Sequence, residues 1–169
     1  NIVRFKGSPD YENPIDSDGD NVYVLNIVAS DGSLQTISPE FRVIILNIND
    51  NNPVFVDLQE DVEVTNGQIN VFDIVVTDAD GDDISLSVTG DDASAFVISD
   101  SDTLSFATAP DFANPSDQNG DNVYKIVLQA TDGERITSSN QIEITVLEVN
   151  NPPVISDLLT SYTLDENIA

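Results

Sequence analysis

Residues 9–32 read PDYENPIDSDGDNVYVLNIVASDG, and residues 110–133 read PDFANPSDQNGDNVYKIVLQATDG. The two stretches lie 101 positions apart, and 13 of their 24 positions are identical. The retained residues are mostly Asp, Asn, Pro and Gly, together with Tyr23 and Tyr124. A repeat of about 100 residues has the length of a globular domain, so the sequence predicts a tandem array of domains.

Between the acidic loops, the chain has the two-residue period of β-strands. Tyr23, Leu25 and Ile27 fall on one face of a strand over 23–29, and the pattern recurs from Tyr124 onward. Further strands are expected at 41–48, 69–77, 84–88, 95–98, 103–107 and 141–149. No stretch has sustained helical periodicity; about one helical turn is expected, near 92–95 or 111–114. This pattern predicts an all-β fold, a seven-stranded Greek-key β-sandwich in tandem repeats.

Two proline-bearing junctions, at 49–53 and 150–153, divide the chain. Residues 53–152 are expected to form one complete repeat, residues 1–52 the C-terminal half of a repeat, and residues 153–169 the opening strand of a next repeat. Half a sandwich does not bury a core by itself. Either the chain is a fragment of a longer one or the missing strands come from elsewhere, and the sequence leaves both alternatives open.

The charge of the chain is extreme, with 31 acidic residues against 5 basic ones and a net charge of −26. Nucleic acid and anionic membrane surfaces would repel such a protein, so neither is expected as a partner. Of the acidic residues 8 are Glu and the rest are Asp, a compact oxygen ligand common in turns. The composition therefore favours loops that hold hard cations such as Ca²⁺. The alternative is an acidic surface that serves only solubility.

Several classes of site are excluded by composition. The chain has no Cys, His, Met or Trp, which removes disulfides, zinc centres, and catalysis by a thiol or an imidazole. No apolar run approaches the ~18 residues that would span a bilayer, so no direct membrane insertion is expected.

Four motifs carry a family resemblance: Asp10-Tyr11-Glu12, Ala29-Ser30-Asp31-Gly32, Asn49-Asp50-Asn51-Asn52-Pro53-Val54-Phe55 and Thr77-Asp78-Ala79-Asp80. In their order and spacing they resemble the motifs of cadherins. The stretch ENPxDxDGDNxY is similar to the bacterial cadherin-like version, found in large surface adhesins and secreted multidomain proteins. The resemblance covers essentially the whole chain.

The cadherin resemblance implies a calcium site at the first junction. Its oxygen ligands would come from the two repeats and from the linker between them: Asp10, Glu12, Asn49, Asp50, Asn51, Asp78, Asp80 and Asp132. Without a cation, these carboxylates would repel one another by about 1–4 kcal/mol per pair. The second junction lacks the linker aspartate, and Ala113 stands where the first copy has Glu12, so weak or no binding is expected there. The segment Leu164-Asp165-Glu166-Asn167 fits the pattern of the glutamate that a first strand donates.

The loops 16–20 and 117–121 resemble the start of a calcium-binding loop. Both lack the flanking helices and the terminal glutamate of an EF-hand. Metal binding and a simple Asp/Asn-Gly turn are both compatible with these residues.

The sequence favours a calcium-rigidified spacer or adhesive module of an extracellular or cell-surface protein. Its expected partners are neighbouring repeats of the same chain, and a homophilic protein partner or a polysaccharide. The alternative is a calcium-dependent carbohydrate-binding module, but Tyr11, Phe112 and Tyr162 are the few aromatic residues left outside the core pattern. An enzyme is not expected, because the motif carboxylates recur from copy to copy and nothing indicates a sheltered acid of raised pKa.

Overall fold

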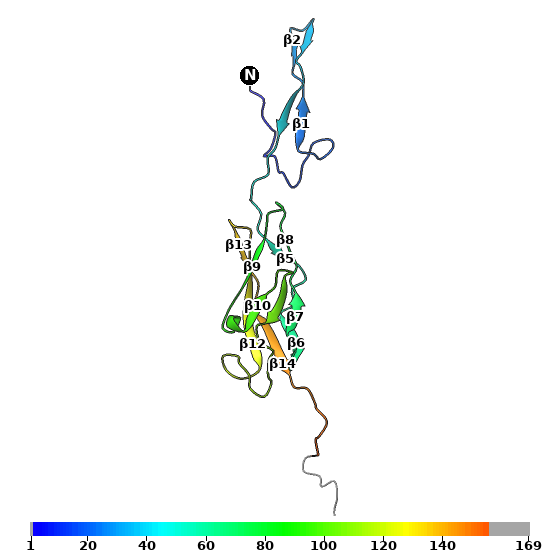
Figure 1. Cartoon of the computed structure of the whole chain (residues 1–169). Helices are drawn as coiled ribbons and strands as arrows, with labels where there is room; N and C mark the ends of the chain where they lie inside the picture. The colour runs from blue at the N-terminus through cyan, green and yellow to red at the C-terminus, as the bar shows by residue number, and fades with distance from the viewer. Residues whose placement is uncertain (1, 156–169) are drawn as a thin grey trace, which may run out of the picture.

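The computed structural model describes residues 2–155, and it consists of two groups of β-strands placed end to end (Figure 1). The N-terminal segment, residues 2–52, contains four short strands: β1 (Val22–Leu25), β2 (Val28–Ser30), β3 (Gln35–Ile37) and β4 (Phe41–Ile44). Most of the expected opening strand at 153–169, including the Leu164-Asp165-Glu166-Asn167 pattern and Tyr162, lies outside the described residues.

The central sandwich, residues 53–147, contains ten strands and one turn of 3-10 helix. The elements are β5 (Val54–Phe55), β6 (Asp61–Thr65), β7 (Asn70–Asp73), β8 (Val76–Thr77), β9 (Ser85–Thr89), η1 (Ala93–Ala95), β10 (Phe96–Ile98), β11 (Thr103–Phe106), β12 (Val123–Thr131), β13 (Ile136–Ser138) and β14 (Ile142–Leu147). The helical turn expected near 92–95 is therefore confirmed, whereas 111–114 forms only a turn.

Two sheets face each other in this sandwich. One has the order β9-β12-β14-β6, in which β6 runs parallel to β14; the other has the order β10-β11-β7. Strands β13 and β14 pair in turn with the two halves of β12, like one interrupted strand. Apart from β10 and β11, the neighbours among these seven principal strands are not consecutive in the chain, and the predicted all-β sandwich is confirmed.

The core lies between these two sheets and is built from alternating residues of the long strands. Tyr124, Ile126 and Leu128 on β12 are fully buried, as are Ile142 and Ile144 on β14. Because the side chains of a strand alternate between its faces, their neighbours Lys125 and Glu143 point outward and form an ion pair of 3.3 Å. The Tyr124 hydroxyl is satisfied within the core, since it accepts a hydrogen bond from the Ser116 backbone N–H at 3.2 Å.

The N-terminal segment repeats the pairing register of the sandwich with an offset of 101. Tyr23 pairs with Val43 as Tyr124 pairs with Ile144, and the same offset relates β2–β3 to β12–β13. The loop contacts repeat as well, since Asn21 and Asn122 each donate a side-chain hydrogen bond to the backbone carbonyl ten residues earlier. The sequence repeat is thus also a structural repeat.

Three strand extents expected from the sequence are wrong. The strand over 23–29 is broken into β1 and β2, the strand over 41–48 ends at Ile44, and the strand over 69–77 divides into β7 and β8. In the N-terminal segment, no strand takes the place of β9 or β6 among the described residues. The edges of β2 and β4 therefore lack the partners that β9 and β6 provide for β12 and β14.

Candidate metal centre

The acidic loop from Asp78 to Asp82 follows β8 and brings three carboxylates together. One Asp78 carboxylate oxygen, Oδ1, accepts hydrogen bonds from the backbone N–H groups of Asp80 at 2.9 Å and Gly81 at 3.1 Å. The turn needs glycine at position 81, where φ is +77°. As a result, carboxylate oxygens of Asp78, Asp80 and Asp82 lie within 4.8 Å of one another.

The linker between the two strand groups binds to Asp80. The Asp80 carboxylate accepts hydrogen bonds from the backbone N–H groups of Asp50 (3.0 Å) and Asn51 (2.8 Å), and from the Asn51 side-chain amide (2.9 Å). The Asn47 side chain donates to the Asp80 carbonyl at 2.7 Å. Asp80 is only 9% exposed, so this carboxylate anchors the linker to the sandwich.

Glu12 brings a carboxylate from the N-terminal segment to the same place. Carboxylate oxygens of Glu12, Asp50 and Asp80 lie within 4.8 Å of one another. Burial, a hydrogen bond to Asp80, and the charges of Asp80 and Asp50 together raise the pKa of Glu12. Burial also acts to raise the pKa of Asp80, but its hydrogen bonds to Asn51 and Glu12 outweigh that effect and lower it. When no cation is bound, protonation of Glu12 therefore relieves repulsion among these carboxylates.

Four oxygens at this junction are buried and have no hydrogen-bond partner among the described residues. They are Asn49 Oδ1, Asp78 Oδ2, Asp82 Oδ2 and Asp132 Oδ2. A buried oxygen without a donor is costly, and amide and carboxylate oxygens are the ligands that Ca²⁺ takes. The donor set therefore fits a hard divalent cation.

The two remaining predicted ligands, Asp132 and Asp10, each use one oxygen to hold a local turn. Asp132 Oδ1 accepts hydrogen bonds from the backbone N–H groups of Glu134 (2.8 Å) and Arg135 (2.6 Å). Burial would raise the pKa of Asp132, but these bonds and the Asn49 side chain lower it. Asp10 Oδ1 accepts from the N–H groups of Glu12 and Asn13, both at 3.1 Å. Asp10 lines the same surface hollow as Glu12, Asp50 and Asn51, but it belongs to none of the close carboxylate groups.

Sequence reasoning missed two residues of the junction, Asn47 and Asp82. Asn47 fixes the Asp80 carbonyl, and it lies two residues before the linker stretch that begins at Asn49. Asp82 adds a third carboxylate to the group of Asp78 and Asp80. Its pKa is raised mainly by burial, and further by the charges of Asp78, Asp80, Asp132 and Glu134. The alternation of aspartates at 78, 80 and 82 was the signal for it.

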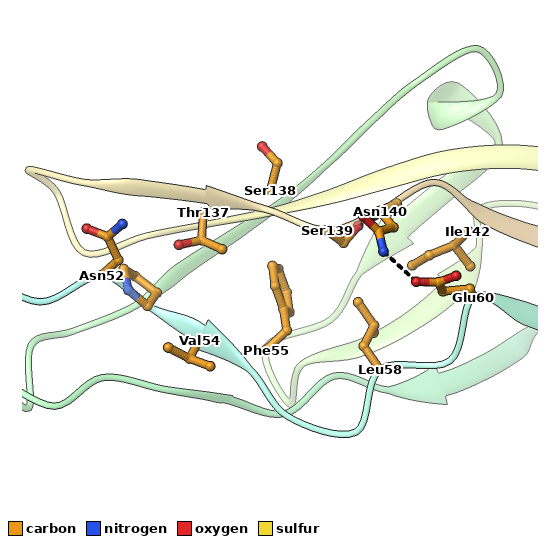
Figure 2. Close-up of a pocket in the computed structure, with 11 residues that line it drawn as sticks. Asn52, Val54, Phe55, Leu58, Glu60, Thr137, Ser138, Ser139, Asn140 and Ile142 are labelled. Carbon is orange, nitrogen blue, oxygen red and sulfur yellow. Dashed lines mark hydrogen bonds between the residues drawn. The ribbon is translucent and has the colours of Figure 1, made fainter.

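Two other features of the surface have weaker claims to a function. Asp16, Asp18 and Asp20 have carboxylate oxygens within 4.8 Å of one another, and Asp16 Oδ1 is buried without a hydrogen-bond partner among the described residues. Asp18 and Asp20 are exposed, however, and the second copy has Asn119 in place of Asp18. Figure 2 shows a groove between the 52–60 stretch and the strands β13 and β14. Its one carboxylate, Glu60, accepts a hydrogen bond from Asn140, so the groove lacks the paired acids of a glycosidase.

No family model matches the sequence. Among curated proteins, the chain is 32% identical to mouse Protocadherin Fat 4 over 92% of its own length, and 30% identical to mouse Cadherin-related family member 2 over 98%. The chain spans only 3% and 13% of these two relatives.

Solved structures give the same fold. The extracellular domain of Protocadherin GammaB4 superposes with a TM-score of 0.57 at 25% identity, covering 80% of this chain and 21% of that one. Human Mucin-like Protocadherin EC1-2 superposes with a TM-score of 0.61 at 20% identity, covering 86% of this chain and 74% of that one. Within residues 2–155, no helix has the length and apolar character needed to cross a membrane. Sequence and fold together identify a cadherin-like domain in this chain.

Proposed function

We propose that the junction between residues 1–52 and 53–152 binds Ca²⁺ and stiffens an adhesion module of an extracellular protein. The observation that carries the proposal is the set of buried oxygens without hydrogen-bond partners on Asn49, Asp78, Asp82 and Asp132. They lie beside carboxylates contributed from both sides of the linker. The similarity to cadherins supports the same conclusion.

Each part of the chain has its own role in this proposal. The sandwich would offer Asp78, Asp80 and Asp132, the N-terminal segment Asp10 and Glu12, and the linker Asn49, Asp50 and Asn51. Bound Ca²⁺ would supply positive charge that these oxygens share. Because the oxygens come from three parts of the chain, their common attachment would restrict rotation of one repeat against the other. With no cation, the linker is held to Asp80 by hydrogen bonds from Asn47, Asp50 and Asn51, whereas the carboxylate of Glu12 meets the charges of Asp80 and Asp50.

The wider setting is proposed from the relatives. Residues 1–52 would be the closing half of one repeat, residues 53–152 a complete repeat, and residues 153–169 the start of a third. A stiff row of such repeats would hold a distal part of an extracellular protein away from the cell surface. Neighbouring repeats and a homophilic partner are the interactions proposed for it.

Replacing Asp78 and Asp80 by Ala tests the assignment. We expect the full chain to melt at a higher temperature in millimolar Ca²⁺ than in EDTA, and the double variant to lose that increase. Asp83→Ala is the matched control, because Asp83 is exposed and lies outside the close carboxylate groups. A variant whose calcium-dependent increase equals that of the parent would remove these two residues from the site.

A further inference from the structure

The chain contains two Asn-Gly pairs, Asn66-Gly67 and Asn119-Gly120. Such a pair can lose ammonia without an enzyme, because glycine has no side chain to keep its backbone nitrogen away from the asparagine amide carbon. The reaction needs an accessible asparagine and a glycine nitrogen that is free to attack. Both asparagines are exposed, so exposure does not distinguish the two pairs. Their hydrogen bonds do.

The turn at Asn66-Gly67 is tied to its surroundings by three hydrogen bonds. The Gly67 N–H, which carries the attacking nitrogen, donates to the Pro110 carbonyl at 2.9 Å. The Asn66 N–H donates to the Leu147 carbonyl at 2.9 Å, and the Asn66 side-chain oxygen accepts from the Phe112 N–H at 3.0 Å. The attacking nitrogen becomes free only when this turn opens, so the reaction at Asn66 is slowed by the free energy of that opening.

The turn at Asn119-Gly120 leaves the attacking nitrogen free. Within residues 2–155, the Gly120 N–H donates no hydrogen bond, and a Cβ built on Gly120 would meet no atom within 4 Å. The Asn119 side chain is held only by Asp121. The Asp121 N–H donates to the Asn119 amide oxygen at 3.3 Å, and the Asp121 carboxylate accepts from the amide nitrogen at 2.9 Å. The first bond lies on the oxygen that gains negative charge during the attack, so it favours the reaction.

The first copy shows that the loop accepts an aspartate at this position. It has Asp18-Gly19 there, and φ is +75° at Gly19 and +74° at Gly120. The bond that closes the loop is also kept: the N–H of residue 20 donates to Asp16 at 3.1 Å, and the N–H of residue 121 donates to Asp117 at 2.9 Å. Conversion of the asparagine to aspartate would therefore reproduce the Asp-x-Asp-Gly-Asp pattern of residues 16–20.

We infer that Asn119 is a site of spontaneous deamidation in the folded protein, and that Asn66 is protected from it. The Gly120 nitrogen bonds to the side-chain amide carbon of Asn119, and the amide nitrogen leaves as ammonia with the proton that Gly120 gives up. Water then opens the resulting five-membered ring at either carbonyl, which gives aspartate or isoaspartate. Water is the only co-reactant, so the step needs neither a bound cation nor an oxidant.

The modification would change the charge at one end of the sandwich. The loop lies beside the end of β14, because the Asn122 carbonyl accepts a hydrogen bond from the Val146 N–H at 2.9 Å. The aspartate product adds a negative charge there and replaces the amide that donates to Asp121. The isoaspartate product also lengthens the backbone within the turn.

The test follows both sites in the full chain, kept in mildly alkaline buffer with EDTA, by peptide mapping with mass spectrometry over time. We expect amide loss at Asn119 to be roughly tenfold or more faster than at Asn66, because only Asn66 must wait for its turn to open. In denaturant the two rates should become similar. Amide hydrogen exchange of the native chain should be fast at Gly120 and slow at Gly67. The variant Asn119→Gln should lose the fast phase of ammonia release.

Three results would overturn the inference. The first is equal amide loss at the two sites in the folded chain, or faster loss at Asn66. The second is amide exchange at Gly120 as slow as at Gly67, which would mean that its nitrogen is not free. The third is fast ammonia release that persists in Asn119→Gln, which would place the reaction elsewhere.

Discussion

At the scale of single residues, two effects act on the charge of Asp80 with opposite sign. Its carboxylate is nearly buried, where charge is disfavoured, yet it accepts hydrogen bonds from two linker backbone N–H groups and from Asn51. Those bonds favour its charged form and place it beside Glu12 and Asp78. The residue that fixes the linker is thereby also the centre of the anionic cluster.

Replacing Asp82 by Asn should stabilise the protein without calcium and weaken its binding of calcium. Asp82→Asn should raise the melting temperature in EDTA, because burial and neighbouring charges disfavour the ionised carboxylate. The same change should lower calcium affinity roughly tenfold, because one anionic ligand is lost. Melting curves and calorimetric titrations of the variant and of Asp83→Asn would show it, with no change expected for the latter. Shifts of the same sign in both conditions would contradict this role.

Glu12 predicts a pH dependence of calcium binding. Its folded pKa is raised above 4.5, so its favourable protonated contact with Asp80 is present at low pH and lost as pH rises through that pKa. Binding of a cation needs the carboxylate, so calcium affinity should fall as pH decreases from 7 towards the raised pKa. Calorimetry at a series of pH values would measure the fall, and Glu12→Gln should reduce its steepness. A parent protein whose affinity is constant over this range would contradict the role given to the raised pKa of Glu12.

At the scale of elements, the sequence predicts the repeat better than the ends of its strands. The alternation from Tyr124 onward gives the correct buried face of β12, since Tyr124, Ile126 and Leu128 are all fully buried. The same alternation from Tyr23 gives the correct shared face of Tyr23 and Leu25, opposite the exposed Val24, but not the break after Leu25. The extent of a strand depends on the partners along its edges, and those partners are distant in sequence.

In the candidate site too, some residues were predictable from the sequence and others were not. The aspartates at 78 and 80 and the linker residues were predictable because they stand in motifs. The contribution of Asn47 was not predictable, because its hydrogen bond depends on how the linker lies against the Asp80 carbonyl. The local turn held by Asp10 likewise appears only in three dimensions.

Truncating the side chains at equivalent positions of β14 and β4 should lower the free energy of unfolding by different amounts. Ile144→Ala should destabilise the sandwich by about 2–5 kcal/mol, because Ile144 is fully buried and the change leaves a cavity. Val43→Ala, at the matching position of β4, should cost less than about 1 kcal/mol, because Val43 is only partly buried. Chemical denaturation of both variants would measure the difference. Equal losses of stability would mean that the two copies are packed alike.

At the scale of the whole molecule, two strand groups are joined end to end by a short linker (Figure 1). The carboxylate groups that include Asp50 and Asp80 lie at this linker. The net charge of −26 makes close approach of the two groups costly unless cations are present. Two of the three close carboxylate groups in the described part of the chain therefore lie at the junction, where a bound cation has most effect on the arrangement of the strand groups.

The most direct test is the distribution of distances between the two strand groups, measured with and without Ca²⁺. The chain has no cysteine, so Ser33→Cys and Ser87→Cys would give one exposed spin-label site on each side of the junction. We expect a narrow distribution in millimolar Ca²⁺ and a broad one in EDTA, with the broad one retained in calcium when Asp78 and Asp80 are replaced by Ala. Identical distributions in calcium and in EDTA would contradict the claim that the junction is held by bound Ca²⁺.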